Sequence, residues 1–242
     1  MEEDAIRGIS KKPSDMSLMI LGSTIEYRSL CRKLGIKPHV VDFSRANFDA
    51  LSAYSKEKFT DEIFVESDWL QIPFTETFDV ILGHRPFNVI RHDQVGVFFK
   101  KMHDSLKKEG VFFCRGNVRF PGDQDHLALL VEQWGKAATR PHRLFSYLEV
   151  PLYMHCADAR GYLDYPKARD VIRKFHEQKF INDSDYEDIQ PLISMPEGTK
   201  FRSFIAKEEL EEHIRAAGFR SIEWLLTSHT FTKNMPIIKL IK

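Results

Sequence analysis

Short apolar runs that alternate with stretches of helical periodicity restrict the fold of this chain more than any other feature. The runs cover residues 18–21, 39–42, 62–67, 78–83 and 111–114. Between them, apolar side chains recur every three or four residues, which is the period of an amphipathic helix. Strands joined by helices of this length form right-handed βαβ units, so the strands lie parallel and helices cover both faces of the sheet. The first half of the chain therefore predicts an open α/β sheet.

Two of the connecting segments carry signals for where a helix ends. The first predicted helix runs to Leu34 and stops at Gly35. Between residues 91 and 108, apolar side chains at helical spacing predict a second one, which basic residues and Gly110 would end. The residues of that spacing are Val95, Phe98, Phe99, Met102 and Leu106.

The end of the chain returns to the same alternation. Residues 207–217 carry acids in the first turns, one apolar face and a closing Gly218, which together predict a helix. Two strands are expected over 221–230 and 236–241, and the short link between them predicts that they pair antiparallel. With the five earlier runs, this pair predicts a mostly parallel sheet of seven strands.

The segment 116–202 interrupts the alternation. It is rich in Pro, Tyr and His, with helical pieces predicted around 125–138 and 165–178. It is far longer than an ordinary connection of about 4–6 residues. We expect the whole chain, 1–242, to form one domain, with 116–202 as a partly helical insertion that covers the ligand edge of the sheet and supplies an acceptor pocket. A purely structural extension is the alternative.

Composition narrows the function classes. Lys plus Arg and Asp plus Glu both number 35, so no overall field favours nucleic acid or an anionic membrane. No segment approaches the ~20 apolar residues that span a bilayer. The three cysteines are widely spaced, which argues against a metal site and a disulfide framework and fits a cytoplasmic location. The sequence predicts neither a metal nor an oligomeric state.

In an open α/β sheet the ligand lies beyond the carboxyl ends of the strands. Gly22 follows the first strand, and Ser23 and Glu26 have the spacing of a capping box. The loop lacks the G-x-G-x-x-G pattern that lets a dinucleotide pyrophosphate approach a helix N-terminus. A ligand without phosphate does not need those glycines. A simple helix cap is the alternative interpretation.

Two acids follow the second and third strands. A carboxylate at Asp42 is placed to accept ribose hydroxyls, and Asp68 could accept from an adenine amino group while an apolar neighbour packs on the ring. Taken singly, Asp42 could be a turn or capping residue before Ser44, and Asp68 a loop acid beside a core Trp69. A glycine turn, a ribose acid and an adenine acid in this order favour an adenosine ligand.

The ordered series resembles the class I S-adenosylmethionine-dependent methyltransferases over roughly residues 17–115, and 207–242 is similar to their final helix and strand pair. Residues 21–28 look like a branch whose first loop reads Gly-x-Thr-Pro-Glu-Leu-Arg, although Ile25 stands where that branch often has proline. Segments 41–44, 68–74 and 78–83 are similar to its next three motifs.

The resemblance implies a Rossmann-like fold, S-adenosylmethionine as cofactor, and methyl transfer to an acceptor that we expect to be a small molecule. The cofactor contacts it implies are Gly22, Ser23, Thr24, Glu26, Asp42, Phe43, Asp68, Trp69 and Gly83. If the acceptor needs a general base, His84 is the first candidate, because it follows the fourth strand; a structural histidine is the alternative. A binding protein without catalysis and another nucleotide-binding Rossmann enzyme are the competing functions.

Overall fold

The structure is a computed structural model that describes every residue except 1, 10, 124, 138–142, 195–203 and 226–232. The chain divides into two compact units. The first, here called the sheet unit, comprises Met1–Gly116, Leu210–Leu226 and Pro236–Lys242. The second, the helical unit, comprises Asn117–Glu209 and Thr227–Met235.

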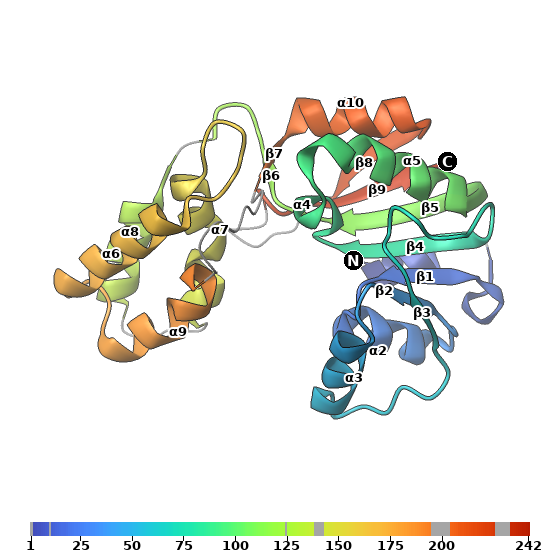
Figure 1. Ribbon diagram of the computed structural model, residues 1–242, viewed down its shortest axis with the longest axis horizontal. Helices are drawn as coiled ribbons and strands as arrows, with labels where there is room; N and C mark the ends of the chain where they lie inside the picture. The colour runs from blue at the N-terminus through green and yellow to red at the C-terminus, as the bar shows by residue number, and fades with distance from the viewer. Residues whose placement is uncertain (1, 10, 124, 138–142, 195–203, 226–232) are drawn as a thin grey trace. The chain divides into compact units, whose positions relative to one another are not determined.

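The sheet unit is built on a seven-stranded sheet with the order β3-β2-β1-β4-β5-β9-β8 (Figure 1). The strands are β1 (Leu18–Leu21), β2 (His39–Asp42), β3 (Ile63–Glu66), β4 (Phe78–His84), β5 (Leu106–Arg115), β8 (Ser221–Leu225) and β9 (Ile237–Ile241). The strands from β3 to β5 are parallel, whereas β9 pairs antiparallel with both β5 and β8. The predicted sheet and its antiparallel end are confirmed, although part of the expected strand 221–230 lies outside the described residues.

Helices cover both faces of this sheet, as predicted. The sheet unit contains α1 (Glu2–Arg7), α2 (Ile25–Leu34), α3 (Arg45–Tyr54), α4 (Pro86–Val89) and α5 (Val95–Ser105), with short 3-10 turns at Pro13–Asp15 and His92–Gln94. Helix α10 (Lys207–Ala217) begins in the helical unit and ends in the sheet unit. Tyr27 and Cys31 of α2 pack with Ile20 on one face, while Phe98 of α5 meets Phe112 of β5 edge-on on the other.

One helix boundary was predicted wrongly. Helix α5 ends at Ser105, and Leu106 is extended and pairs with Phe78 at the start of β5. The side chain of Leu106 is fully buried, as a helical core residue would also be. Since helical spacing and the first buried position of the next strand place an apolar residue at the same point, periodicity could not separate them.

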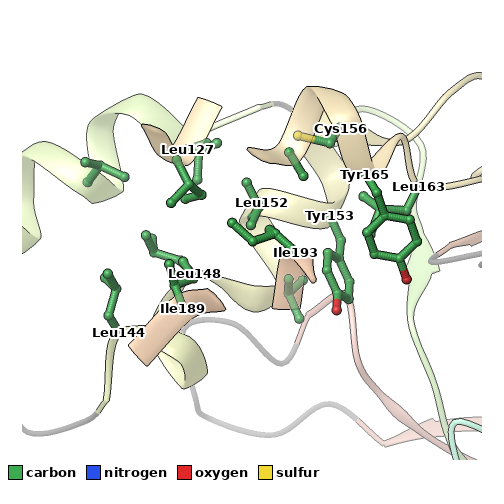
Figure 2. Packing of buried hydrophobic residues seen from close by; sticks show 14 of the residues in the cluster. Leu127, Leu144, Leu148, Leu152, Tyr153, Cys156, Leu163, Tyr165, Ile189 and Ile193 are labelled. Atoms are coloured by element: carbon green, nitrogen blue, oxygen red, sulfur yellow. The ribbon is translucent and has the colours of Figure 1, made fainter. Parts of the chain in front are cut away.

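The helical unit has its own hydrophobic core. Its elements are β6 (Val118–Arg119), α6 (Leu127–Lys136), α7 (Leu144–Cys156), α8 (Tyr165–Glu177), α9 (Asp183–Ile193) and β7 (Ile205–Ala206). Helices α6 and α8 match the two predicted pieces, and β6 pairs with β7 in parallel. Figure 2 shows buried side chains of this core, among them Leu148, Leu152 and Ile189.

None of the helices in the described part of the chain combines the length and the apolar character that a membrane span needs.

Candidate functional site

A cavity of about 800 Å³ opens at the carboxyl edge of the sheet. Residues that follow β1, β2, β3 and β4 line it, so it straddles the point where the strand order reverses between β1 and β4. This is the position at which open α/β sheets bind ligands. Of the predicted site residues, the cavity brings together Gly22, Ser23, Thr24, Asp42, Phe43, Asp68, Trp69 and His84.

The turn after β1 depends on Gly22. Its φ of 78° lies in the left-handed region, and its amide donates to the carbonyl of Val41 at 2.8 Å. A β-carbon on Gly22 would stand in ordinary contact with the Trp69 ring, at 3.4 Å, so the left-handed φ is what favours glycine at this turn. Trp69 is fixed from the other side, because its Nε1 donates to the same Val41 carbonyl at 2.9 Å.

The predicted capping box is wrong. Thr24, not Ser23, is the N-cap of α2, and its side chain makes no capping hydrogen bond. Ser23 instead donates its hydroxyl to Asp42 at 2.6 Å, across from β1 to β2. Because the side chain of Thr24 does not cap α2, the first turn of this helix keeps amide donors for another acceptor at the cavity wall.

Asp42 is held by its neighbours. It is only 2% exposed, and besides the Ser23 hydroxyl it accepts from the Asn47 side chain at 3.0 Å and from the Ser44 amide at 3.1 Å. Ser44 in turn caps α3 through Asn47. Asp42 therefore both stabilises the turn before α3 and lines the cavity. About four lone-pair positions exist on a carboxylate, and three of them are occupied here, which leaves about one for a ligand.

The loop after β3 is more open. Asp68 is exposed, and one of its carboxylate oxygens accepts from the Leu70 amide at 2.9 Å, which shapes the turn. Phe43, at the cavity wall beside Asp42, is 75% exposed. An aromatic ring this exposed next to a half-buried Trp69 offers an apolar surface that the protein itself does not use.

His84 and Gly83 at the end of β4 have different surroundings. His84 is exposed and lines both the main cavity and a second one of about 480 Å³. Gly83 does not line the main cavity; a β-carbon there would meet Pro86 at 2.9 Å, so close packing explains this glycine. Glu26 lines the second cavity and not the first. Thr24 lines both cavities.

Sequence reasoning missed part of the cavity wall. The additional residues are Leu21, Asn47, Leu51, Ser67, Leu70, Val89, Ile90, Arg91 and Gln94. Asn47 lies one turn into α3, where its bond to Asp42 gives it a second position at the edge. Val89 is the last residue of the short helix α4, and Ile90, Arg91 and Gln94 follow it. The only sequence signal of these four residues is their place after β4. In the described part of the chain, no group of three or more His, Cys, Asp or Glu side chains could hold a metal ion.

No known protein-family model matches the sequence, and no curated protein does. Solved structures match over nearly the whole chain. The S-adenosylmethionine dependent methyltransferase from Mesorhizobium loti is 12% identical, with a TM-score of 0.55 over 99% of this chain and 96% of that one. A Rhodobacter sphaeroides protein provisionally named a Zn-dependent alcohol dehydrogenase is 15% identical, with a TM-score of 0.59 over 99% and 88%.

The CMeT domain of the citrinin polyketide synthase is 10% identical, with a TM-score of 0.56 over 99% of this chain. The present chain spans 49% of that structure's length, about half of it. At these identities the likenesses show the fold alone. Together with the strand order, they define a Rossmann-like fold of the kind found in class I S-adenosylmethionine-dependent methyltransferases.

Proposed function

We propose that this chain binds S-adenosylmethionine in the carboxyl-edge cavity and transfers the methyl group to a small-molecule acceptor. One observation carries the proposal: a single cavity gathers Gly22, Asp42 and the Asp68–Trp69 pair from the ends of three parallel strands. Its volume of about 800 Å³ lies within the ~300–1,000 Å³ typical of small-molecule sites.

The polar groups of the cavity match the parts of such a cofactor. Amides at the open start of α2 suit a carboxylate, and the one remaining acceptor position of Asp42 suits a ribose hydroxyl. A second ribose bond requires the Ser23 hydroxyl to turn away from Asp42. Asp68 and the rings of Phe43 and Trp69 form the adenine end.

When bound, S-adenosylmethionine supplies a methyl group activated by a sulfonium. The protein's task is then to orient the nucleophile and exclude water. His84 stands at the wall shared by the two cavities, and we assign the smaller one to the acceptor. An imidazole beside the acceptor can take the proton that an attacking hydroxyl or protonated amine must lose. Besides His84, the residues that line this smaller cavity include Glu26 and Tyr27.

No described residue of 116–202 lines the smaller cavity, so that cavity is an alternative to the acceptor pocket predicted in this segment. The predicted role of 116–202 as a lid and acceptor pocket stays a prediction. Hydrogen exchange tests it, because a lid gains protection around residues 147–165 when the cofactor site fills. No change in protection there would leave the segment a structural extension.

Calorimetry with S-adenosylmethionine, S-adenosylhomocysteine and NAD tests the cofactor. We expect the first two to bind and NAD not to bind. Formation of S-adenosylhomocysteine over a panel of small acceptors then tests catalysis, with His84→Gln expected to keep cofactor affinity and lose turnover. Binding of both adenosyl ligands without turnover would favour a regulatory binding protein, and binding of NAD alone would overturn the proposal.

A further inference from the structure

A third cavity, of about 310 Å³, lies at the opposite edge of the same sheet. It is formed where α2 ends and where the chain enters β2 and β3. Its wall consists of Arg28, Arg32, Gly35, Ile36, Lys37, Pro38, Lys58, Phe59, Thr60, Asp61 and Glu62. None of these residues lines the cofactor cavity.

Arg28 is the least solvent-exposed charge at this cavity. Its side chain is 0% exposed, and its guanidinium lies between the rings of Phe48 and Phe59, at 4.4 and 4.2 Å from their centroids. Nε and Nη2 both bond to Glu62, at 2.9 and 2.7 Å, and Nη2 also donates to Ser52. The third nitrogen, Nη1, is buried without any hydrogen-bond partner.

An unpaired donor on a buried guanidinium is costly, because the group has left water without gaining an acceptor. The rest of the guanidinium is fixed by Glu62 and the two rings, so it cannot turn to pair Nη1 elsewhere. An acceptor oxygen would remove that cost, and since the Arg28 side chain is 0% exposed, the cavity wall must open locally for the oxygen to reach Nη1. A guanidinium held in one orientation also loses little entropy on binding a further oxygen.

The other charges around the cavity are mostly positive. Lys37 and Lys58 are exposed, and neither forms an ion pair in the described part of the chain. Arg32 reaches only the exposed Glu57, at 3.4 Å. On the acidic side, Glu62 is already paired with Arg28, which leaves Asp61 as the one lining carboxylate without a cationic partner among the described residues.

The geometry points to a binding site for a small phosphate-bearing anion in this cavity. The phosphate would accept from Arg28 Nη1, with Lys37 and Lys58 supplying positive charge and the Thr60 hydroxyl a further polar contact. Phosphate has more acceptor oxygens and more charge near neutral pH than a monocarboxylate, so it outweighs the single repulsive Asp61. The cavity volume limits the ligand to free phosphate or a small phosphomonoester.

Titration of the intact chain with inorganic phosphate, followed by NMR chemical shifts of the amides around Gly35 and Thr60, tests this site. The exposed pair is changed in Lys37→Gln/Lys58→Gln, and Lys12→Gln/Lys56→Gln removes two exposed lysines that do not line the cavity. We expect saturable binding that weakens roughly tenfold in the first variant, as loss of two charge contacts implies, and is unchanged in the second.

Parallel titrations with a small phosphomonoester and with malonate identify the ligand class. Tighter binding of the monoester than of free phosphate assigns the site to a phosphorylated metabolite, and the reverse assigns it to phosphate itself. Tighter binding of malonate overturns the phosphate assignment. Equal weakening in both lysine variants, or no saturable binding of any of these anions, overturns the site. Neither result bears on S-adenosylmethionine, which is tested at the other edge.

Discussion

The two edges of the sheet differ in how many of their polar groups are paired within the protein. At the amino edge, the charged side chains that are shielded from solvent are tightly paired. Arg28 donates to Glu62 from two nitrogens, and Asp79 accepts from Lys11, Ser17 and Lys107. At the carboxyl edge, the start of α2 lacks a side-chain cap and Asp68 is exposed. Polar groups that are paired hold the chain in place, whereas those left open are available to a ligand.

This difference separates mutations that affect stability from those that affect binding. Substitutions at the paired amino edge should lower the free energy of unfolding and leave cofactor affinity unchanged in the folded protein. Substitutions at the carboxyl edge should change affinity more than stability. The unpaired Nη1 of Arg28 is the buried exception at the amino edge. Together with the exposed Lys37 and Lys58, it forms the proposed anion site.

The largest effect is expected at the buried ion pair. Glu62→Ala leaves the guanidinium of Arg28 without its carboxylate partner while both rings still cover it, which costs about 3–5 kcal/mol of unfolding free energy. Urea denaturation followed by circular dichroism measures the loss. Glu57→Ala is the matched control, since it removes an exposed carboxylate that pairs with Arg32 at 3.4 Å. Such surface pairs contribute about 0–1 kcal/mol. Equal losses of unfolding free energy in Glu62→Ala and Glu57→Ala would contradict the claim that the buried pair matters more for stability than the exposed one.

The next largest effect is expected at the turn after β1. Gly22→Val places a β-branched side chain at a φ of 78°, which L residues rarely adopt, so the backbone of the turn that lines the cavity must change. We expect cofactor affinity to fall by roughly 100-fold, or about 2.7 kcal/mol. Gly35→Val introduces similar strain at a φ of 68° with nothing within 4 Å of the added β-carbon. Calorimetry should show normal cofactor affinity in that control. A Gly22→Val protein that binds normally would show that the loop after β1 does not form part of the cofactor site.

Asp79 ties the amino ends of β1 and β4 together. Burial raises the pKa of its carboxyl, but hydrogen bonds from Lys11, Ser17 and Lys107 outweigh it and hold the pKa well below its ordinary 3.8. A depressed carboxyl pKa contributes stability that is fully present above about pH 5 and is lost as the pH falls below 3.8. Asp79→Asn should therefore cost about 2 kcal/mol at pH 7 and much less at pH 2.

Thermal unfolding at several pH values measures this dependence. Asp49→Asn provides the control, because Asp49 is an exposed acid that pairs with Arg45 four residues away. The Asp79 assignment fails if the two variants show the same pH dependence of stability.

The sequence predicted the sheet and the meeting of Gly22, Asp42 and Asp68, because parallel strands bring their carboxyl ends to one edge. It could not predict that Ser23 bonds to Asp42, since that bond joins the loop after β1 to the end of β2 and competes with a local helix cap that the spacing favours equally well. Residues close together in the sequence can predict where the chain turns. Which group a short polar side chain bonds to depends on tertiary packing, which the sequence pattern does not show.

The helical unit was harder to predict for a different reason. Helices α7 and α9 contain Pro151 and Pro191, and proline inside a helix removes a hydrogen bond and normally signals its end. Burial of Leu148, Leu152 and Ile189 in the core of this unit offsets that local cost. The prediction of α6 and α8 succeeded because neither helix contains an interior proline after its first turn.

The smallest expected effect is at Asp42, and it tests whether a nearly saturated carboxylate still binds a ligand. Asp42→Ala should weaken S-adenosylmethionine binding by about tenfold or more, since one charged acceptor bond is worth roughly 1.5–3 kcal/mol. The same change also leaves the Ser23 hydroxyl and the Asn47 amide without their acceptor, so unfolding free energy must be measured alongside affinity. Ser23→Ala separates the ligand-binding role of Asp42 from its structural role. It frees an acceptor position on Asp42, so affinity for S-adenosylmethionine should stay equal or rise. Loss of affinity in Ser23→Ala with none in a folded Asp42→Ala would move the ribose contact from the carboxylate to the serine.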